Sequence, residues 1–177
     1  MHSNMAPAPQ DSASSELYLP ENRVVSVNDL SVRFTNSERT VDAVRNLSFH
    51  VDRRETLAIV GESGSGKSVT SLALMRLIEH GGGKIISGSM PFRGRNGQTL
   101  DLAKADSPTM RSIRGADIAM IFQEPMTSLN PVFTAGDQIA ESICEHQGMS
   151  TSAARAEALR MLDLVRIPEA RNVLDRY

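Results

Sequence analysis

The feature that most constrains this chain is a glycine-rich stretch in its first half. The pattern G-x-x-x-x-G-K-[ST] is matched in full by Gly61, Glu62, Ser63, Gly64, Ser65, Gly66, Lys67 and Ser68. The apolar run of residues 56–60 precedes it, and apolar residues at helical spacing follow it as far as the glycines at 81–83. The order predicts a buried strand of a parallel sheet over residues 56–60, then a loop, then a helix.

The residue types of this stretch suit the binding of phosphate groups. Glycine lets the backbone bend tightly, so that its N–H groups and the start of the following helix face an anion. Lys67 would bring a positive charge to the β- and γ-phosphates of a nucleotide, and the Ser68 hydroxyl would ligate Mg²⁺. A chance glycine-rich turn is the alternative, which the predicted strand and helix on either side disfavour. We therefore predict that all eight residues belong to a nucleotide site.

Length and charge exclude several other classes of protein. At 177 residues the chain can bury one large core. Its formal net charge is −2 and it has no dense basic run, which argues against nucleic-acid binding. The single cysteine, Cys144, excludes an internal disulfide. Without an apolar run of about 18 residues or a secretory signal pattern, we expect a soluble protein of the cytoplasm.

Hydrophobic periodicity predicts an antiparallel region before the helical part of the chain. Residues 1–22, rich in proline, serine and alanine, show no periodicity and are expected to form a disordered leader. Alternation predicts strands over about 25–34 and 44–51 as one hairpin. Two further strands are expected on either side of the turn signal Asn96-Gly97.

The second half of the chain predicts mainly helices. A short helix should open at Ser107-Pro108. Residues 118–122 are a second fully apolar run, which we expect to be a sheet neighbour of residues 56–60. Beyond Pro131, two amphipathic helices are expected to pack on each other.

Two side chains outside the loop are candidates for the site. Phe34 closes the first predicted strand, where its ring could stack on a nucleotide base or fill the core of the hairpin. Gln123 follows the second apolar run. Ligands bind at the carboxyl ends of strands in open α/β sheets, and an amide there could reach Mg²⁺ or a water molecule. A plain polar strand end is the alternative for Gln123.

Residues 61–68, taken with the segment Ile-Phe-Gln-Glu-Pro-Met-Thr-Ser-Leu-Asn-Pro at 121–131, resemble the ATP-binding subunits of ABC importers. The resemblance covers about residues 24–177 and is closest to the dipeptide/oligopeptide group, including importers of glutathione. It implies an α/β fold, the cassette of P-loop nucleotide triphosphatases, with a parallel core sheet and an antiparallel β subdomain. Residues 23–134 would form this core, and residues 135–177 the start of a helical subdomain.

The same resemblance implies cofactors, roles and partners. Phe34 is similar to the aromatic residue that stacks on adenine. Gln123 looks like the glutamine that contacts Mg²⁺ and the attacking water, which makes it the candidate catalytic residue. The cofactors would be ATP and Mg²⁺. The partners would be transmembrane permease subunits, a second nucleotide-binding domain and, indirectly, a periplasmic binding protein, on the cytoplasmic face of the inner membrane.

The sequence also departs from the pattern of that family. Its 177 residues contain no Leu-Ser-Gly-Gly signature, no apolar run ending in Asp-Glu after Gln123, and no switch histidine. We expect the front part of a cassette, incomplete at its C-terminus. Two hypotheses follow: the ATPase motor of an importer, or a nucleotide-binding fragment without turnover. A small-molecule kinase is disfavoured because the segment at 123–131 would have no role in it.

Overall fold

The computed structural model describes residues 17–123 and 129–176. The chain divides into two compact units, residues 1–110 and residues 111–177, which we describe separately. The part of the predicted leader at residues 1–16 lies outside the described residues, as does the segment 124–128 that contributes to the resemblance. The three-part division predicted from sequence remains a prediction.

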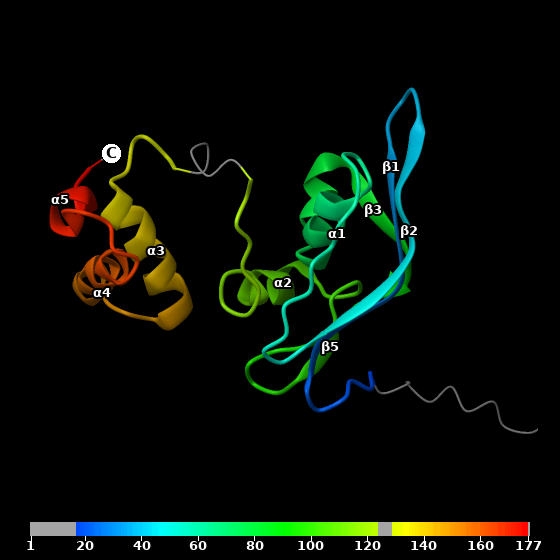
Figure 1. Ribbon diagram of the computed structural model, residues 1–177, viewed down its shortest axis with the longest axis horizontal. Helices are drawn as coiled ribbons and strands as arrows, with labels where there is room; N and C mark the ends of the chain where they lie inside the picture. Colours follow the sequence, from blue (N-terminus) through cyan, green and yellow to red (C-terminus); the bar gives the residue numbers. More distant parts are fainter. Residues whose placement is uncertain (1–16, 124–128, 177) are drawn as a thin grey trace, which may run out of the picture. The chain divides into compact units, whose positions relative to one another are not determined.

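The first unit is built on a five-stranded antiparallel sheet (Figure 1). The strands are β1 (Arg23–Thr35), β2 (Thr40–Asp52), β3 (Gly83–Ser89), β4 (Pro91–Arg93) and β5 (Thr99–Asp101). Strand β1 lies at the centre: it pairs with β2 along one edge and with β3 and then β4 along the other, and β5 pairs with β4. Both predicted hairpins are confirmed.

The core of the first unit is built around β1. Val27, Leu30 and Val32 of β1 are essentially inaccessible to solvent, as are Met90 and Leu102 from the second hairpin. Burial in β1 falls in two runs of three residues, 25–27 and 30–32, which are separated by two exposed residues at a register irregularity. A single long strand therefore carries much of the core of this unit.

The helix after the loop is shorter than the sequence predicted. Helix α1 spans Lys67–Leu74, and a separate 3₁₀ turn, η1, spans Leu77–Gly81. Arg76, between them, adopts a left-handed conformation with φ of 55°. Its guanidinium donates hydrogen bonds to three carbonyl oxygens in the segment after β5 and pairs with Glu79. This distant anchor holds Arg76 at the break between α1 and η1.

The two apolar runs are not strands, so the prediction of a parallel sheet through them is wrong for the described chain. Residues 56–60 belong to no strand and have no ladder partners, and Val60 is 87% exposed. Residues 118–122 are likewise outside any strand, and Ile121 is 94% exposed. A strand requires hydrogen bonds to a neighbour. Among the described residues the only parallel pairing is one isolated bridge between Arg114 and Ile118.

The residues just before β1 are held against the sheet. The Leu19 side chain is buried. Arg93 of β4 donates hydrogen bonds to the backbone oxygens of Leu19, Pro20 and Glu21. The end of the expected leader, residues 17–22, is therefore ordered by a contact with a strand about seventy residues further along the chain.

The second unit is helical. Helix α2 (Ser107–Ile113), which opens where the sequence predicted, runs across the border of the two units. It is followed by α3 (Ala135–Gln147), α4 (Thr151–Leu164) and the short α5 (Ala170–Leu174), which the sequence reading missed. The core shared by these three helices is made of Ala140, Ile143, Ala154, Ala158, Leu162, Ala170 and Leu174. The predicted packing of two amphipathic helices on each other is confirmed.

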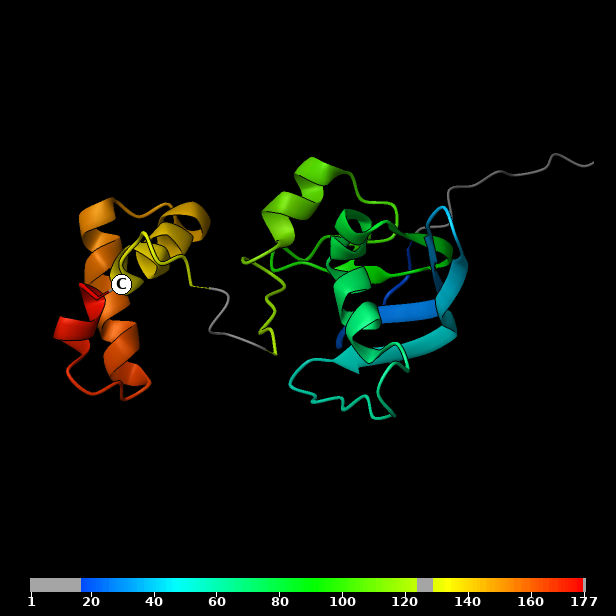
Figure 2. The ribbon, with the colours of Figure 1, turned by 90° about the horizontal axis from the view of Figure 1, so that it is seen from above.

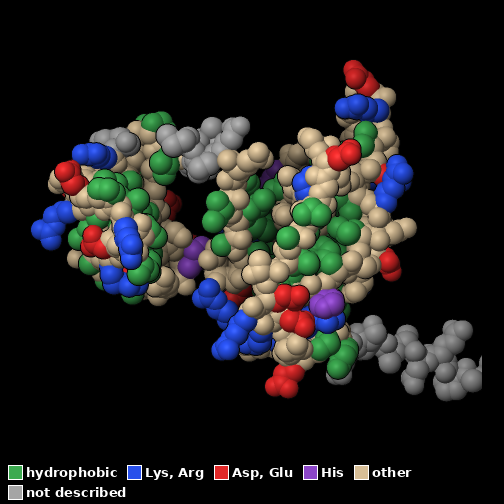
Figure 3. All heavy atoms as spheres, in the orientation of Figure 1, with side chains coloured by type: hydrophobic (Ala, Val, Ile, Leu, Met, Phe, Trp, Pro, Cys, Tyr) green, Lys and Arg blue, Asp and Glu red, His purple; other side chains and the backbone are tan. Residues whose placement is uncertain are grey.

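Local signals set the ends of the two long helices. Thr134 caps α3 and Ser150 caps α4, each accepting a backbone N–H with its side-chain oxygen. Gly148 ends α3 in a left-handed conformation. Acidic and basic side chains are interspersed over this unit (Figure 3). One such group is Arg155, which bridges Asp137 of α3 and Asp175 after α5. Among the described residues, no helix is long and apolar enough to cross a membrane.

Candidate nucleotide-binding site

The glycine-rich loop lies directly against the β1–β2 hairpin. Gly66, which precedes α1, has φ of 90°, a left-handed conformation that favours glycine. A Cβ at this position would collide with the backbone oxygen of Ala43 in β2. The loop therefore approaches the strand as closely as it does because residue 66 has no side chain. The chain reaches this point from β2 through residues 55–62, which form neither helix nor strand, and α1 with η1 lies on one side of the sheet (Figures 1 and 2).

Lys67 places its ammonium group inside the bend of the loop. Its Nζ donates hydrogen bonds to the backbone oxygens of Gly61 at 2.9 Å and Glu62 at 2.6 Å, and lies 3.3 Å from Oγ of Ser65. Three oxygens of the loop thus hold the cation at its centre. This is the position from which an ammonium group can serve as a point charge for phosphate oxygens bound by the same loop.

The start of α1 leaves polar groups available beside that cation. Within the first turn, the Thr70 hydroxyl and backbone N–H both donate to the Gly66 oxygen, so these groups are used internally. The Ser68 side chain is exposed and makes no hydrogen bond with a described residue. The first turn contains no acidic residue to repel an anion. The loop, Lys67 and the helix start therefore fit a phosphate group, and the Ser68 hydroxyl fits one ligand position of Mg²⁺.

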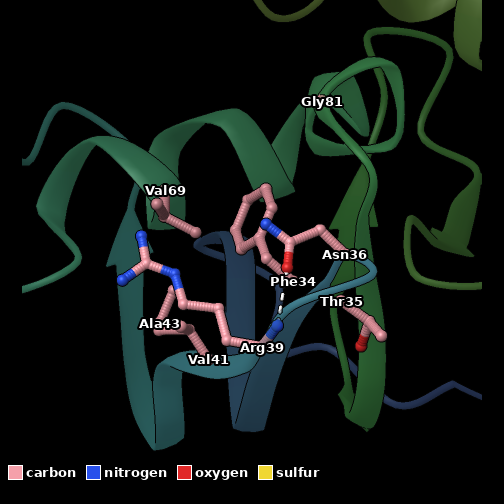
Figure 4. A pocket seen from close by; sticks show the side chains of 8 residues that line it. All are labelled: Phe34, Thr35, Asn36, Arg39, Val41, Ala43, Val69 and Gly81. Atoms are coloured by element: carbon pink, nitrogen blue, oxygen red, sulfur yellow. Dashed lines mark hydrogen bonds between the residues drawn. The ribbon is translucent and has the colours of Figure 1, made fainter.

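A pocket of about 360 Å³ opens beside α1 (Figure 4). Its lining is apolar toward the sheet and polar toward the hairpin turn, and consists of Phe34, Thr35, Asn36, Arg39, Val41, Ala43, Val69 and Gly81. Val69 follows Ser68 directly, and Ala43 is the residue that contacts Gly66. The pocket is therefore continuous in sequence and in space with the phosphate loop. Its volume and apolar walls fit a planar heterocycle such as a purine base.

The Phe34 ring makes contacts that bear on both roles predicted for it, base stacking and packing in the hairpin core. Its ring lines the pocket, and two of its ring atoms lie so close to Gly83 of β3 that a Cβ there would be 2.7 Å away. Gly83 has no side chain, and its backbone therefore forms the support of the ring. The ring is thus packed at one place and open to the pocket at another. Stacking on a base remains a prediction, and the structure is compatible with it.

The sequence reading missed most of the other residues that line this pocket. Val69 was read only as part of the predicted helix. Arg39, Val41 and Ala43 lie between the two predicted strands at 25–34 and 44–51, and no role was given to them. Their proximity to Phe34 depends on the register of β2 against β1, where Phe34 faces Val41. The alternation of Val41 and Ala43 immediately after the turn was the one signal that could have indicated a shared face.

Gln123 belongs to the second unit, apart from the loop residues, which lie in the first. It is exposed and lies in a bend. Residues 118–122 before it form no strand, so the strand that was expected to carry it is not present among the described residues. Among the described residues no group of three or more His, Cys, Asp or Glu side chains could hold a metal ion. The catalytic and Mg²⁺-binding roles of Gln123 remain predictions.

Comparison with curated proteins identifies close relatives. The chain is 72% identical over 161 residues to the glutathione import ATP-binding protein of Pectobacterium atrosepticum, and 62% identical over 154 residues to that of Salmonella typhimurium. These alignments cover 91% and 87% of this chain. The chain spans about a quarter of the length of these relatives, 26% and 25% respectively.

Comparisons with solved structures and with family models agree with the likeness to these ATP-binding proteins. A dimeric ATP-binding cassette bound to ADP and Pi superimposes with a TM-score of 0.70 at 22% identity, over 86% of this chain and 60% of that one. A second dimeric structure of the same cassette, described as a bacterial ABC transporter cassette, gives the same TM-score at 21% identity. These two likenesses show a cassette fold of mixed α and β structure. The family model described as ABC transporter matches residues 44–176, which include the whole phosphate loop and both long helices, and the chain therefore belongs to the ABC transporter family.

Proposed function

We propose that this chain binds ATP together with Mg²⁺, through the loop at residues 61–68 and the pocket around Phe34. The observation that carries the proposal is the position of Lys67, whose ammonium group is held by Gly61, Glu62 and Ser65 inside the loop. The adjoining pocket of about 360 Å³ supplies an apolar wall for the base. Phosphate binding and base binding are thus supported by neighbouring features of one unit.

The larger function follows from the relatives. We propose that the chain is part of the ATP-binding subunit of an importer of glutathione or short peptides, because two relatives at 72% and 62% identity are named glutathione import ATP-binding proteins. Such a subunit would act with transmembrane permease subunits and a second nucleotide-binding domain at the cytoplasmic face of the inner membrane. In the complete subunit Gln123 would contact Mg²⁺ and the attacking water during ATP hydrolysis.

The 177 residues by themselves support binding better than turnover. Phosphoryl transfer depends on positioning and on neutralising charge with several groups at once. The chain offers Lys67, Ser68 and Gln123, but no Asp-Glu pair after an apolar run follows Gln123. We therefore propose that these residues alone bind nucleotide without measurable steady-state hydrolysis.

The binding proposal is tested with Lys67→Ala, measured by calorimetry with ATP and Mg²⁺. The substitution removes the fixed cation and leaves the backbone of the loop in place. The affinity should fall by about 1.5–3 kcal/mol, the range of a charge-assisted hydrogen bond. The matched control is Lys84→Ala, because Lys84 is an exposed lysine on β3 that does not line the pocket.

Equal ATP affinity in the parent chain and in Lys67→Ala would contradict the proposal. A similar loss in Lys84→Ala would show that the effect is only the change in net charge. A circular dichroism spectrum of each variant establishes that the compared proteins have the same secondary structure.

A further inference from the structure

Arg39 is an arginine of the nucleotide pocket to which the predicted site assigns no role. It lies at the turn between β1 and β2 and lines the pocket together with Phe34 and Val69. In Figure 4 its guanidinium extends along the side of the pocket lined by Ala43 and Val69, while the Phe34 ring forms another wall. A positive charge therefore lies in a pocket whose other walls are neutral.

Hydrogen bonds within the turn fix the backbone of Arg39. The side-chain oxygen of Asn36 accepts hydrogen bonds from the backbone N–H of Glu38 at 3.1 Å and of Arg39 at 2.8 Å. The backbone N–H of Asn36 in turn donates to the Arg39 oxygen at 3.0 Å. Such a closed turn fixes the direction in which the side chain leaves the backbone. Less conformational entropy of the turn is therefore lost when a ligand binds.

The charge of Arg39 is not used elsewhere in the described chain. Arg33 pairs with Asp42 through two hydrogen bonds at 2.6 and 3.2 Å, and Arg45 lies 3.8 Å from the same carboxylate. Arg39, on the same hairpin, has no ion pair with any described residue. Of these three arginines, the one that lines the pocket is the one without a carboxylate partner.

The place of Arg39 along the site indicates which part of a nucleotide it would meet. The base is expected at Phe34, and the β- and γ-phosphates at Lys67. Between them lie Ala43, which abuts Gly66 of the loop, and Val69, the neighbour of Ser68. Arg39 borders this intermediate region. In a nucleotide, the group between the base and the outer phosphates is the ribose with its first phosphate.

We propose that Arg39 binds the phosphate attached to the ribose, as a third anchor between Phe34 and Lys67. The proposal rests on the nucleotide site described above. The guanidinium offers several N–H donors in a plane, which matches the oxygens of a phosphate group. Because Arg39 is exposed, the interaction is expected to weaken with rising salt.

The test compares adenosine, AMP and ATP as displacers of a fluorescent ATP analogue from the full chain. In Arg39→Ala, the affinities for AMP and ATP should fall by about tenfold, and the affinity for adenosine should stay within about twofold. Arg39→Lys should recover part of the loss. Arg45→Ala is the matched control, because Arg45 lies on the same hairpin outside the pocket with 76% of its side chain exposed.

Two results would overturn the proposal. An equal loss for adenosine and AMP would mean that the guanidinium stacks on the base, and unchanged affinities would mean that Arg39 is a surface residue. Arg39→Gln, which keeps an extended polar side chain, should repeat the pattern of Arg39→Ala and guards against a folding defect. If the parent chain binds ATP and Lys67→Ala weakens the binding as expected while Arg39→Ala does not alter it, only the inference fails. If the parent binds no ATP, the proposed function fails.

Discussion

The β1–β2 hairpin and the apolar run at residues 56–60 are close in the chain and similar in residue type, yet only the hairpin forms strands. The hairpin finds its partner locally, through the four-residue turn at 36–39, and the register pairs Phe34 with Val41 and Thr35 with Thr40. Residues 56–60 follow the hairpin but have no ladder partner, and their side chains are exposed. The comparison teaches that an apolar pattern predicts a tendency toward burial, while the availability of a partner backbone decides whether a strand forms.

The largest difference should appear when buried and exposed side chains are truncated. Leu30 of β1 is fully buried, so Leu30→Ala should lower the free energy of unfolding of the first unit by about 2–5 kcal/mol. Leu57→Ala removes the same atoms from the unpaired run, where Leu57 is 41% exposed, and should cost under about 1 kcal/mol. Urea denaturation followed by circular dichroism measures both. Similar costs at the two positions would break the comparison.

A smaller effect is expected from the ion pair that spans the hairpin. The hydrogen bond from Arg33 holds the pKa of Asp42 below its ordinary value of 3.8. Because the folded-state pKa is lowered, the pair stabilises the hairpin above the unfolded-state pKa, and this stabilisation is lost as the pH falls through the folded-state pKa. The stability difference between the parent and Asp42→Asn should therefore shrink on acidification below about pH 4. In an Arg33→Ala background the same substitution should have little pH-dependent effect, and an unchanged pH dependence there would assign the shift to another group.

The smallest effect is expected in the unpaired run itself. Val60 is 87% exposed, so Val60→Ala should change the free energy of unfolding by no more than about 0.5 kcal/mol. The same denaturation experiment applies. A cost above about 1.5 kcal/mol would show that residues 56–60 are packed in solution, and it would restore the parallel strand that the sequence predicted.

The candidate site also has one part that is encoded by neighbouring residues and other parts that depend on residues distant in the sequence. The eight residues of the loop are contiguous, so their spacing alone predicted a phosphate site, and the position of Lys67 within the loop agrees with it. The pocket around Phe34 draws on β1, β2, α1 and η1, which no local pattern connects. Gln123 was predicted from its place after an apolar run, and the strand on which that prediction depended is absent from the described chain.

The sequence by itself determined the features that depend on near neighbours in the chain. These include the phosphate loop, both hairpins, and the helix ends at Thr134 and Ser150, since turns, caps and alternation act over only a few residues. The tertiary structure alone decided the early end of α1 at Leu74, where Arg76 is drawn to carbonyl groups beyond β5, and the burial of Leu19 beside the strand that carries Arg93. It also decided that residues 56–60 and 118–122 form no strand. Hydrogen bonds and packing between distant segments depend on which backbones meet in space, and no window of the sequence contains both partners.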